Sequence, residues 1–262
     1  MNRIDKKFQA LKKSKKKAFI AFITAGYPNI GITKGLALAF DKIGVDIIEL
    51  GIPFSDPMAD GPIIQEASQF ALQKKVHLQE ILNAVKAVRR YSDIPICLMT
   101  YYNPIFCLCE DKFVRRAKNC GVDGVIVPDL PPEEGRSFIK LANKHNLSVI
   151  CFISPTTSPK RIRYISGIAK GFIYYVSLTG VTGPRRQLSQ GLLGHLRAIK
   201  KITKKPVCVG FGLSHPSQVR EVYNVCDAVI IGSAIVKKIK DNLSRKDLVK
   251  NVARFVEYMK DV

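Results

Sequence analysis

The sequence predicts an α/β fold in the form of a single (β/α)8 barrel, and three observations support that prediction. Short runs rich in β-branched residues alternate with amphipathic segments along the whole chain, about every thirty residues. Eight apolar runs occur, and the barrel has eight strands. The length of 262 residues is close to the roughly 250 residues typical of this fold. We therefore expect one barrel domain over residues 1–262.

The expected strands are nearly all apolar, as parallel strands covered on both faces should be. They are Phe19–Thr24, Asp46–Leu50, Ile94–Tyr101, Gly124–Val127, Ser148–Ile153, Phe172–Ser177, Val207–Phe211 and Ala228–Ile231. A doubly wound open sheet is the alternative fold. It is disfavoured because no Gly-x-Gly-x-x-Gly pattern opens a helix in this chain.

The segments between these strands carry apolar residues at helical spacing. They are Ile32–Ile43, Leu78–Arg90, Lys112–Asn119, Pro132–Lys144, Pro159–Ile168, Leu192–Lys201 and Pro216–Tyr223. The two ends of the chain repeat apolar residues in the same way, at Ile4, Phe8 and Leu11 and at Leu248, Val252, Phe255 and Met259. We expect these ends to form extra N- and C-terminal helices that pack on the barrel.

The composition is that of a globular protein. Hydrophobic residues make up 47% and charged residues 24% of the chain, which is enough to bury a substantial core. No apolar run approaches the roughly 20 residues of a membrane-spanning helix, so we expect no membrane association and a cytoplasmic location. The run Ala18–Gly26 after a lysine cluster imitates a secretory signal, but a turn follows it, and the run suits a buried strand.

The cysteines and histidines do not predict a metal site. Several of the seven cysteines lie in apolar strand-like runs, and we interpret the set as small buried hydrophobic residues of a reducing compartment. The histidines show no ligand spacing with one another or with a cysteine pair. They are His77, His145, His195 and His215.

The chain is strongly basic, with 42 Lys and Arg against 21 Asp and Glu and a formal net charge of +21. Such a charge attracts nucleic acid, anionic lipid or phosphorylated substrates. No finger, basic-zipper or RNA-recognition pattern accompanies it, so we expect a lysine-rich solvated surface and no specific nucleic acid. A basic nucleic-acid-binding protein is the non-enzyme alternative. The basic residues are spread along the chain and denser only at Lys12, Lys13, Lys15, Lys16 and Lys17.

Glu49 is the first candidate catalytic residue, because catalytic groups of this barrel lie where strands end. Side chains alternate along a strand, so Glu49 shares a face with Ile47 while Ile48 and Leu50 point toward the helices. If that face is the barrel interior, desolvation raises the pKa of the carboxyl to a value useful for proton transfer. The alternative is a strand-end carboxylate paired with a lysine.

The loop after Glu49 carries Asp56 and Asp60 between Pro53 and Pro62. Aspartates in turns commonly hydrogen-bond their own backbone. The functional alternative is a second carboxylate opposite Glu49, so that one acid donates a proton while another accepts one. Spacing in the sequence does not choose between Asp56 and Asp60.

Glycines end the last two expected strands, in Gly210–Gly212 and in Gly232-Ser233 before a short helical segment. Main-chain N–H groups can approach an anion there, and a helix N-terminus adds favourable partial charge. The loops after strands seven and eight form the recurrent phosphate site of this fold. Although glycine also ends strands for steric reasons, the pattern indicates a phosphorylated small molecule.

The stretch Ser177–Gly183 follows the sixth strand and is hinged by glycines. It is either an ordinary surface loop or a mobile lid that excludes water, and Tyr174 before it is either core or pocket lining. The strand-end loops Tyr101–Pro104 and Ser154–Ser158 are polar without an assignable chemistry. The residues thus indicate a barrel enzyme that acts on a small organophosphate by acid/base catalysis.

The segment Glu49–Gln65 resembles the signature of the tryptophan synthase α subunit family. Further matching stretches follow in the order and spacing of that family, at Phe22–Pro28, Tyr102–Pro104, Val127–Pro131, Gly180–Gly183, Gly210–Gly212 and Ile231–Val236. The resemblance implies a lyase of tryptophan biosynthesis that cleaves indole-3-glycerol phosphate to indole and glyceraldehyde 3-phosphate. Another phosphate-binding barrel isomerase or lyase is the alternative, but it would not need a Glu49–Asp60 pair.

The resemblance also implies roles for individual residues. Glu49 would protonate C3 of the indole ring and take the hydroxyl proton of the side chain, and Asp60 would bind the indole N–H and stabilise the charge there. Thr182 would be the lid residue that meets Asp60, and Asp56 a loop or interface residue. The phosphate contacts would be Gly183, Gly212, Gly232 and Ser233. The indole pocket would include Phe22, Met99, Ile126, Ile153, Tyr174, Phe211 and Ile230.

A partner is implied in the same way, namely the tryptophan synthase β subunit in an α-β-β-α heterotetramer. The β subunit would hold pyridoxal phosphate and receive indole through a tunnel, and this chain would carry no cofactor. Loop closure at the site of one subunit would be coupled to loop closure at the site of the other. Two positions depart from the family pattern. Leu178 stands where a basic or small polar residue is common, and Cys109 where glycine is frequent; we expect them to affect the lid and inter-subunit coupling.

Overall fold

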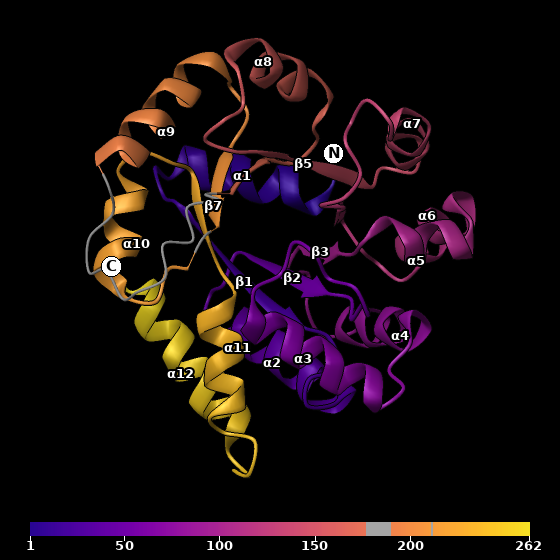
Figure 1. The fold of residues 1–262 in the computed structure, drawn as a ribbon. Coiled ribbons are helices and arrows are strands. Elements are labelled where there is room, and N and C mark those ends of the chain that lie inside the picture. Colours follow the sequence, from indigo (N-terminus) through magenta and orange to yellow (C-terminus); the bar gives the residue numbers. More distant parts are fainter. Residues whose placement is uncertain (177–189, 211) are drawn as a thin grey trace.

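The computed structural model describes residues 1–176, 190–210 and 212–262 of the chain. Eight parallel strands close into a barrel in the order β1 to β8, and helices surround it (Figure 1). The strands are β1 (Ala18–Thr24), β2 (Ile47–Gly51), β3 (Ile96–Met99), β4 (Gly124–Ile126), β5 (Ser148–Ile153), β6 (Ile173–Val176), β7 (Val207–Gly210) and β8 (Ala228–Ile231). The predicted TIM barrel is confirmed.

The helices follow the strands as expected, with additions in two connections. They are α1 (Arg3–Lys13), α2 (Ile30–Lys42), α3 (Pro62–Gln73), α4 (Leu78–Val88), α5 (Tyr102–Leu108), α6 (Glu110–Asn119), α7 (Arg136–Lys144), α8 (Pro159–Ile168), α9 (Gln190–Ile202), α10 (Pro216–Tyr223), α11 (Ser233–Lys240) and α12 (Leu248–Lys260). The helices α3 and α5 were not predicted. The third strand is shorter than the predicted Ile94–Tyr101, because Tyr101 already caps α5.

The side chains of each strand alternate between the barrel interior and the helix layer. Ile47 belongs to the interior cluster, whereas Ile48 and Leu50 belong to the cluster beneath the helices. Glu49 has the same parity as Ile47 and lies beside Phe22 of β1 in the register of the sheet. The strand therefore turns the Glu49 carboxyl inward, as the alternation predicted.

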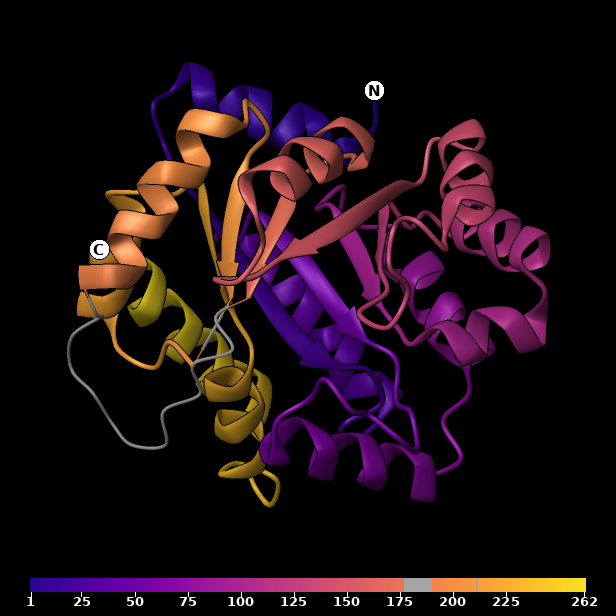
Figure 2. The ribbon, with the colours of Figure 1, turned by 45° about the horizontal axis from the view of Figure 1, so that its top comes forward.

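The N-terminal helix α1 closes the end of the barrel where the strands begin. In Figure 2 it lies at the top, and the strand arrowheads point away from it. Asn2 donates to the Asp123 carbonyl at 2.9 Å and to the Ser148 hydroxyl at 2.6 Å. The buried Asp123 carboxylate accepts from Arg89 at 2.8 Å. Ile4 is fully buried in the interior cluster, so α1 seals this end of the barrel.

The C-terminal helix α12 packs against α2 and α11, which confirms the second flanking helix. Its apolar stripe is buried, with Phe255 partly so. The buried cysteines are Cys97, Cys151, Cys208 and Cys226. For Cys107 and Cys109 the prediction of burial is wrong, because both are exposed around α5, outside the barrel wall. None of the helices in the described part of the chain combines the length and apolar content that crossing a membrane requires.

Cys109 connects α5 to α6 with a φ of 71° and a ψ of 131°. Residues with a side chain rarely adopt this region, and holding one there costs about 1–3 kcal/mol. Glycine adopts it freely because it has no Cβ. The backbone conformation at position 109 therefore favours glycine over the cysteine that this chain carries.

We predict that Cys109→Gly raises the free energy of unfolding by about 1 kcal/mol, because the strain is relieved and an exposed side chain loses no packing. Urea denaturation measures the change. Cys107→Gly, at an exposed position within α5, is the matched control and should lower the stability, because glycine weakens helices. A Cys109→Gly variant no more stable than the parent would contradict the assignment of strain.

Candidate active site

A cavity of about 570 Å³ opens at the carboxyl ends of the strands. This is the end at which barrel enzymes carry their active sites, and the size suits a small organic molecule. Many of the residues predicted for the site line it, namely Phe22, Asp60, Met99, Ile153, Tyr174, Gly212, Ile230, Gly232 and Ser233. The fold thus brings both ends of the predicted site, the acid side and the glycine side, into one cavity.

A few predicted residues lie elsewhere or are not described. Glu49 and Ile126 are fully buried and do not themselves line the cavity, although Ile126 lies in register with Met99, which does. Phe211, Thr182 and Gly183 lie outside the described residues, as does Leu178.

Glu49 is fully buried, and neither oxygen of its carboxyl has a hydrogen-bond partner in the described part of the protein. Burial raises the pKa of this carboxyl to about 8, and the negative charge of Asp60 adds to the effect. No ion pair joins Glu49 to a lysine among the described residues, so the alternative of a lysine-paired carboxylate is wrong. At neutral pH the side chain is mainly an uncharged acid.

Asp60 lies half-buried in the loop between β2 and α3 and lines the cavity. Burial raises the pKa of its carboxyl to about 6, and a hydrogen bond from Tyr101 opposes that increase. Asp56 in the same loop is exposed and does not line the cavity. Of the two aspartates, therefore, only Asp60 lines the cavity, a distinction that spacing in the sequence could not make.

Tyr101 holds Asp60 in place. Its hydroxyl donates to Asp60 Oδ2 at 3.2 Å and accepts from the Ala59 N–H at 2.9 Å. Its buried ring stacks on Phe54 of the same loop, with the centroids 5.0 Å apart. Sequence reasoning noticed this strand-end tyrosine but assigned it no chemistry, because only the folded loop shows what the hydroxyl contacts.

Phe152 is a further lining residue that the sequence did not single out. Its ring lies 4.8 Å from the ring of Tyr174, between centroids, and the two residues are neighbours in the register of β5 and β6. Together they form an aromatic wall. Ile153 next to it lines the cavity as well, so strict alternation would have identified only one of the two.

The opposite wall of the cavity is built from glycines and a helix N-terminus. Gly232 is the N-cap of α11, and Ser233 is its first residue. Gly212 has a φ of 33° and open space around its Cα. Gly210 lies so close to Tyr174 that a Cβ there would be 2.5 Å from the Tyr174 hydroxyl, so only glycine fits at this position. The main chain is therefore accessible, and the α11 terminus offers N–H groups and positive partial charge to an anion.

The site thus combines the buried Glu49 carboxyl and the cavity-lining Asp60 carboxyl, which differ in pKa, with a wall suited to an anion. Pairs of titratable groups whose surroundings separate their pKa values are typical of acid and base catalysts. Fold and cavity together define a barrel enzyme with acid/base groups at the mouth and a place for an anionic substrate group.

Comparison with known proteins is consistent with this class. The family model described as "Tryptophan synthase alpha chain" matches residues 8–262. A tryptophan synthase alpha chain of Caldanaerobacter subterraneus subsp. tengcongensis is 45% identical over 262 residues and covers 100% of both chains. One from Geotalea daltonii is 46% identical over 260 residues, which are 99% of this chain and 98% of the relative.

Solved structures agree with the sequences. The tryptophan synthase subunit alpha of Legionella pneumophila str. Paris has a TM-score of 0.93 and 38% identity, over 99% of this chain and 97% of that one. A mutant tryptophan synthase alpha-subunit of the hyperthermophile Pyrococcus furiosus has a TM-score of 0.86 and 36% identity, over 94% of this chain and 98% of that one. The chain belongs to the tryptophan synthase alpha chain family, the lyases of tryptophan biosynthesis.

We predict that Glu49→Gln stabilises the protein increasingly as the pH rises. The unfolded carboxyl loses its proton near pH 4.5, whereas the folded one keeps it until about pH 8. The parent therefore loses stability through this window, by up to about 1.4 kcal/mol per pH unit. Glutamine has no proton to lose, so the difference between variant and parent grows from pH 5 to pH 8 and then levels off.

Urea denaturation at pH 5, 7 and 8.5 measures this difference. The matched control is Glu257→Gln, which removes an exposed carboxyl on α12 and should show no comparable growth with pH. An equal difference between the Glu49 variant and the parent at all three pH values would rule out a buried acid that stays protonated.

Proposed function

We propose that this chain cleaves indole-3-glycerol phosphate to indole and glyceraldehyde 3-phosphate, with Glu49 and Asp60 as its catalytic residues. The observation that supports the assignment best is the nearness of these two carboxyls, because Asp60 lines the cavity, Asp56 does not, and the charge of Asp60 acts on the fully buried Glu49. Family membership supports the reaction class. We further propose that residues 1–262 act as one catalytic domain.

The two pKa values support different roles. With a pKa of about 8, the carboxyl of Glu49 is protonated at neutral pH and can donate its proton to ring carbon C3. With a pKa of about 6, the carboxyl of Asp60 is mainly ionised there and can accept a hydrogen bond from the indole N–H. Its charge stabilises the positive charge that C3 protonation leaves on the ring nitrogen.

Bond cleavage then follows with a balanced set of transfers. The Glu49 carboxylate, formed by the first step, takes the proton from the side-chain hydroxyl next to the ring. The carbon–oxygen double bond of the aldehyde forms, and the bond between that carbon and C3 breaks. Its electron pair returns to the ring and neutralises the nitrogen. Indole leaves uncharged, and Glu49 regains its proton for the next cycle.

The substrate would lie across the cavity, with the ring by the acids and the phosphate by the glycines. We propose Gly212, Gly232 and Ser233 as phosphate contacts through main-chain N–H groups and the α11 terminus, together with Gly183. Thr182 is proposed as the lid residue. The ring would pack on Phe22, Met99, Ile153, Tyr174, Ile230 and Phe211, and we add Phe152 to this set.

The family implies that this chain works with a β subunit, and we propose an α-β-β-α heterotetramer in the cytoplasm. Indole is small and apolar, so direct transfer to the partner would prevent its loss. Pyridoxal phosphate would be held by the β subunit, and the acid pair of this chain supports a cleavage step that uses no cofactor here.

We predict that Glu49→Gln lowers kcat/KM for indole release by about 10⁴-fold or more, because Glu49 carries out two proton transfers and glutamine can perform neither. Asp60→Asn should lower it by about 10²–10³-fold, since only charge stabilisation is lost. The parent should show a bell-shaped pH profile between about pH 6 and 8, set by ionised Asp60 and protonated Glu49.

Indole release is measured with the parent and with each variant, alone and with a β subunit. Asp56→Asn is the matched control, because this exposed aspartate of the same loop does not line the cavity, and it should retain most of the activity. Turnover near the parent level in Glu49→Gln would refute the catalytic assignment.

We predict that Gly212→Val weakens binding of glycerol 3-phosphate by about tenfold, because a side chain would cover the main chain that faces the phosphate. Indole binding should change less, since the ring lies at the other side of the cavity. Calorimetric titration measures both ligands. Gly194→Val in α9 is a glycine with equally open surroundings away from the cavity, and a similar loss of phosphate affinity there would contradict the assignment.

A further inference from the structure

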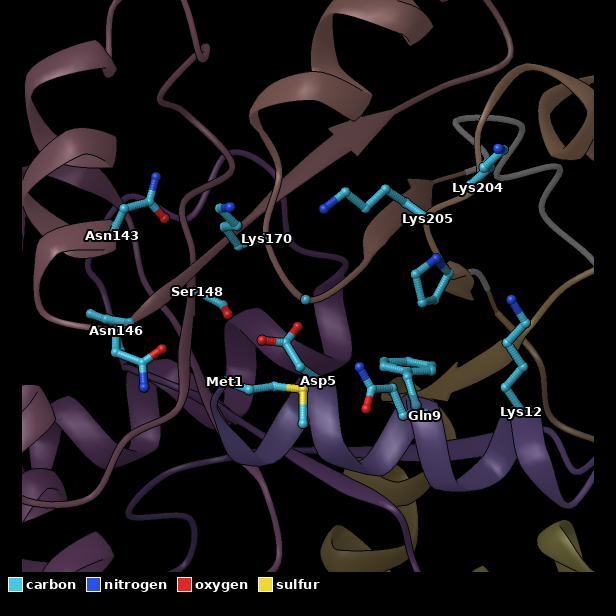
Figure 3. A pocket seen from close by; sticks show the side chains of 14 residues that line it. Met1, Asp5, Gln9, Lys12, Asn143, Asn146, Ser148, Lys170, Lys204 and Lys205 are labelled. Atoms are coloured by element: carbon cyan, nitrogen blue, oxygen red, sulfur yellow. The ribbon is translucent and has the colours of Figure 1, made fainter.

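A second cavity, of about 630 Å³, opens at the end of the barrel opposite the candidate active site. It lies beside α1, and the connections that lead into β5, β6 and β7 form its other walls (Figure 3). Because these segments precede the strands, the cavity is separated from the mouth by the whole packed interior of the barrel. Nothing in the proposed mechanism uses it.

The walls of this cavity carry four lysines and one acid. Lys12 comes from α1, Lys170 from the connection before β6, and Lys204 and Lys205 from the connection before β7; the acid is Asp5. Because the four lysines come from three separate segments, folding brings them to one cavity, and they do not form one basic run in the sequence. Figure 3 shows the side chain of Lys205 extending across the opening toward Lys170.

The amino groups of these four lysines form no ion pair or hydrogen bond in the described part of the protein. Other lysines near this end do have partners there. Lys7 lies 3.5 Å from Asp46, Lys200 pairs with Asp227, and Lys17 donates to the carbonyl of Cys226. A concave surface where charges of one sign predominate concentrates counter-ions, and with four lysines against the single acid Asp5 this cavity favours anions.

The remaining lining residues are not those of a purely ionic site. Phe8 is 8% exposed, and its ring lies 5.9 Å from the ring of Phe172, between centroids, which fixes it as a rigid apolar floor. Leu147 and Pro206 extend this floor. Three carboxamides stand around it, on Gln9, Asn143 and Asn146. Carboxamides both donate and accept hydrogen bonds.

We propose that this cavity binds a nucleoside di- or triphosphate. The lysines would hold the phosphates, the apolar floor would contact the flat base, and the carboxamides would bond the polar edges of the base or sugar. The size is within the range of ligand cavities. Inorganic polyphosphate would leave the apolar floor unused, and a nucleic-acid strand would need an extended groove instead of a cavity bounded by α1.

Isothermal titration of the full chain with ATP at low ionic strength tests the proposal. We expect one ATP to bind, and the double variant Lys170→Gln/Lys205→Gln to bind it about tenfold more weakly, since two lysine–phosphate contacts are lost. The double variant Lys246→Gln/Lys250→Gln is the matched control. It removes the same charge from exposed lysines away from the cavity and should bind ATP within about twofold of the parent.

Two further titrations locate the ligand and define its class. Inorganic triphosphate should bind more weakly than ATP, and saturating glycerol 3-phosphate should not displace ATP, because that ligand belongs to the other end of the barrel. The proposal is overturned by equal weakening in both double variants, by displacement with glycerol 3-phosphate, or by a single-stranded oligonucleotide that binds more tightly than ATP at the same salt concentration. None of these outcomes depends on cleavage activity, so they also distinguish this site from the proposed function.

Discussion

The burial of the Glu49 carboxyl without a hydrogen-bond partner among the described residues is the constraint on which the site depends. Such a group is expensive to keep ionised, so the protein holds it as an uncharged acid with a pKa of about 8. A more polar interior would remove this property, because a single donor or a lysine would return the carboxyl to its ionised form. The rest of the barrel can be understood as the structure that keeps water and cations away from this one side chain.

Closure of the far end of the barrel serves that purpose. Ile4 on α1 fills the interior at the end where the strands begin. Asn2 fixes the helix to the backbone of Asp123 and the hydroxyl of Ser148. The buried Asp123 carboxylate is in turn held by Arg89 and by the N–H of Ile96. Removing one partner from such a cluster leaves a buried charge unpaired and costs several kcal/mol. A polar cluster outside the interior thus secures the apolar interior that Glu49 requires.

Much of the fold and part of the site could be predicted from the sequence, and the division has a physical reason. Strand period indicated that Glu49 faces inward, and glycines marked the cavity wall for which we propose phosphate contacts, because both are properties of local chain geometry. The choice of Asp60 over Asp56 could not be made in this way, since it depends on how the loop folds against Tyr101. Phe152 has the inward-facing parity of Ile150 and could have been found by alternation, whereas the resemblance pointed to its neighbour Ile153.

The two ends of the barrel show how one strongly basic chain can contain an uncharged acid. Long side chains allow the lysines and arginines behind the net charge of +21 to keep their charged groups in solvent. No lysine or arginine of the described residues lines the cavity at the mouth. At the opposite end four lysines line a separate cavity, and they form no ion pair within the described part of the chain. The apolar interior between the ends prevents either environment from altering the other at short range. This separation lets the mouth hold a protonated carboxyl while the far end attracts anions.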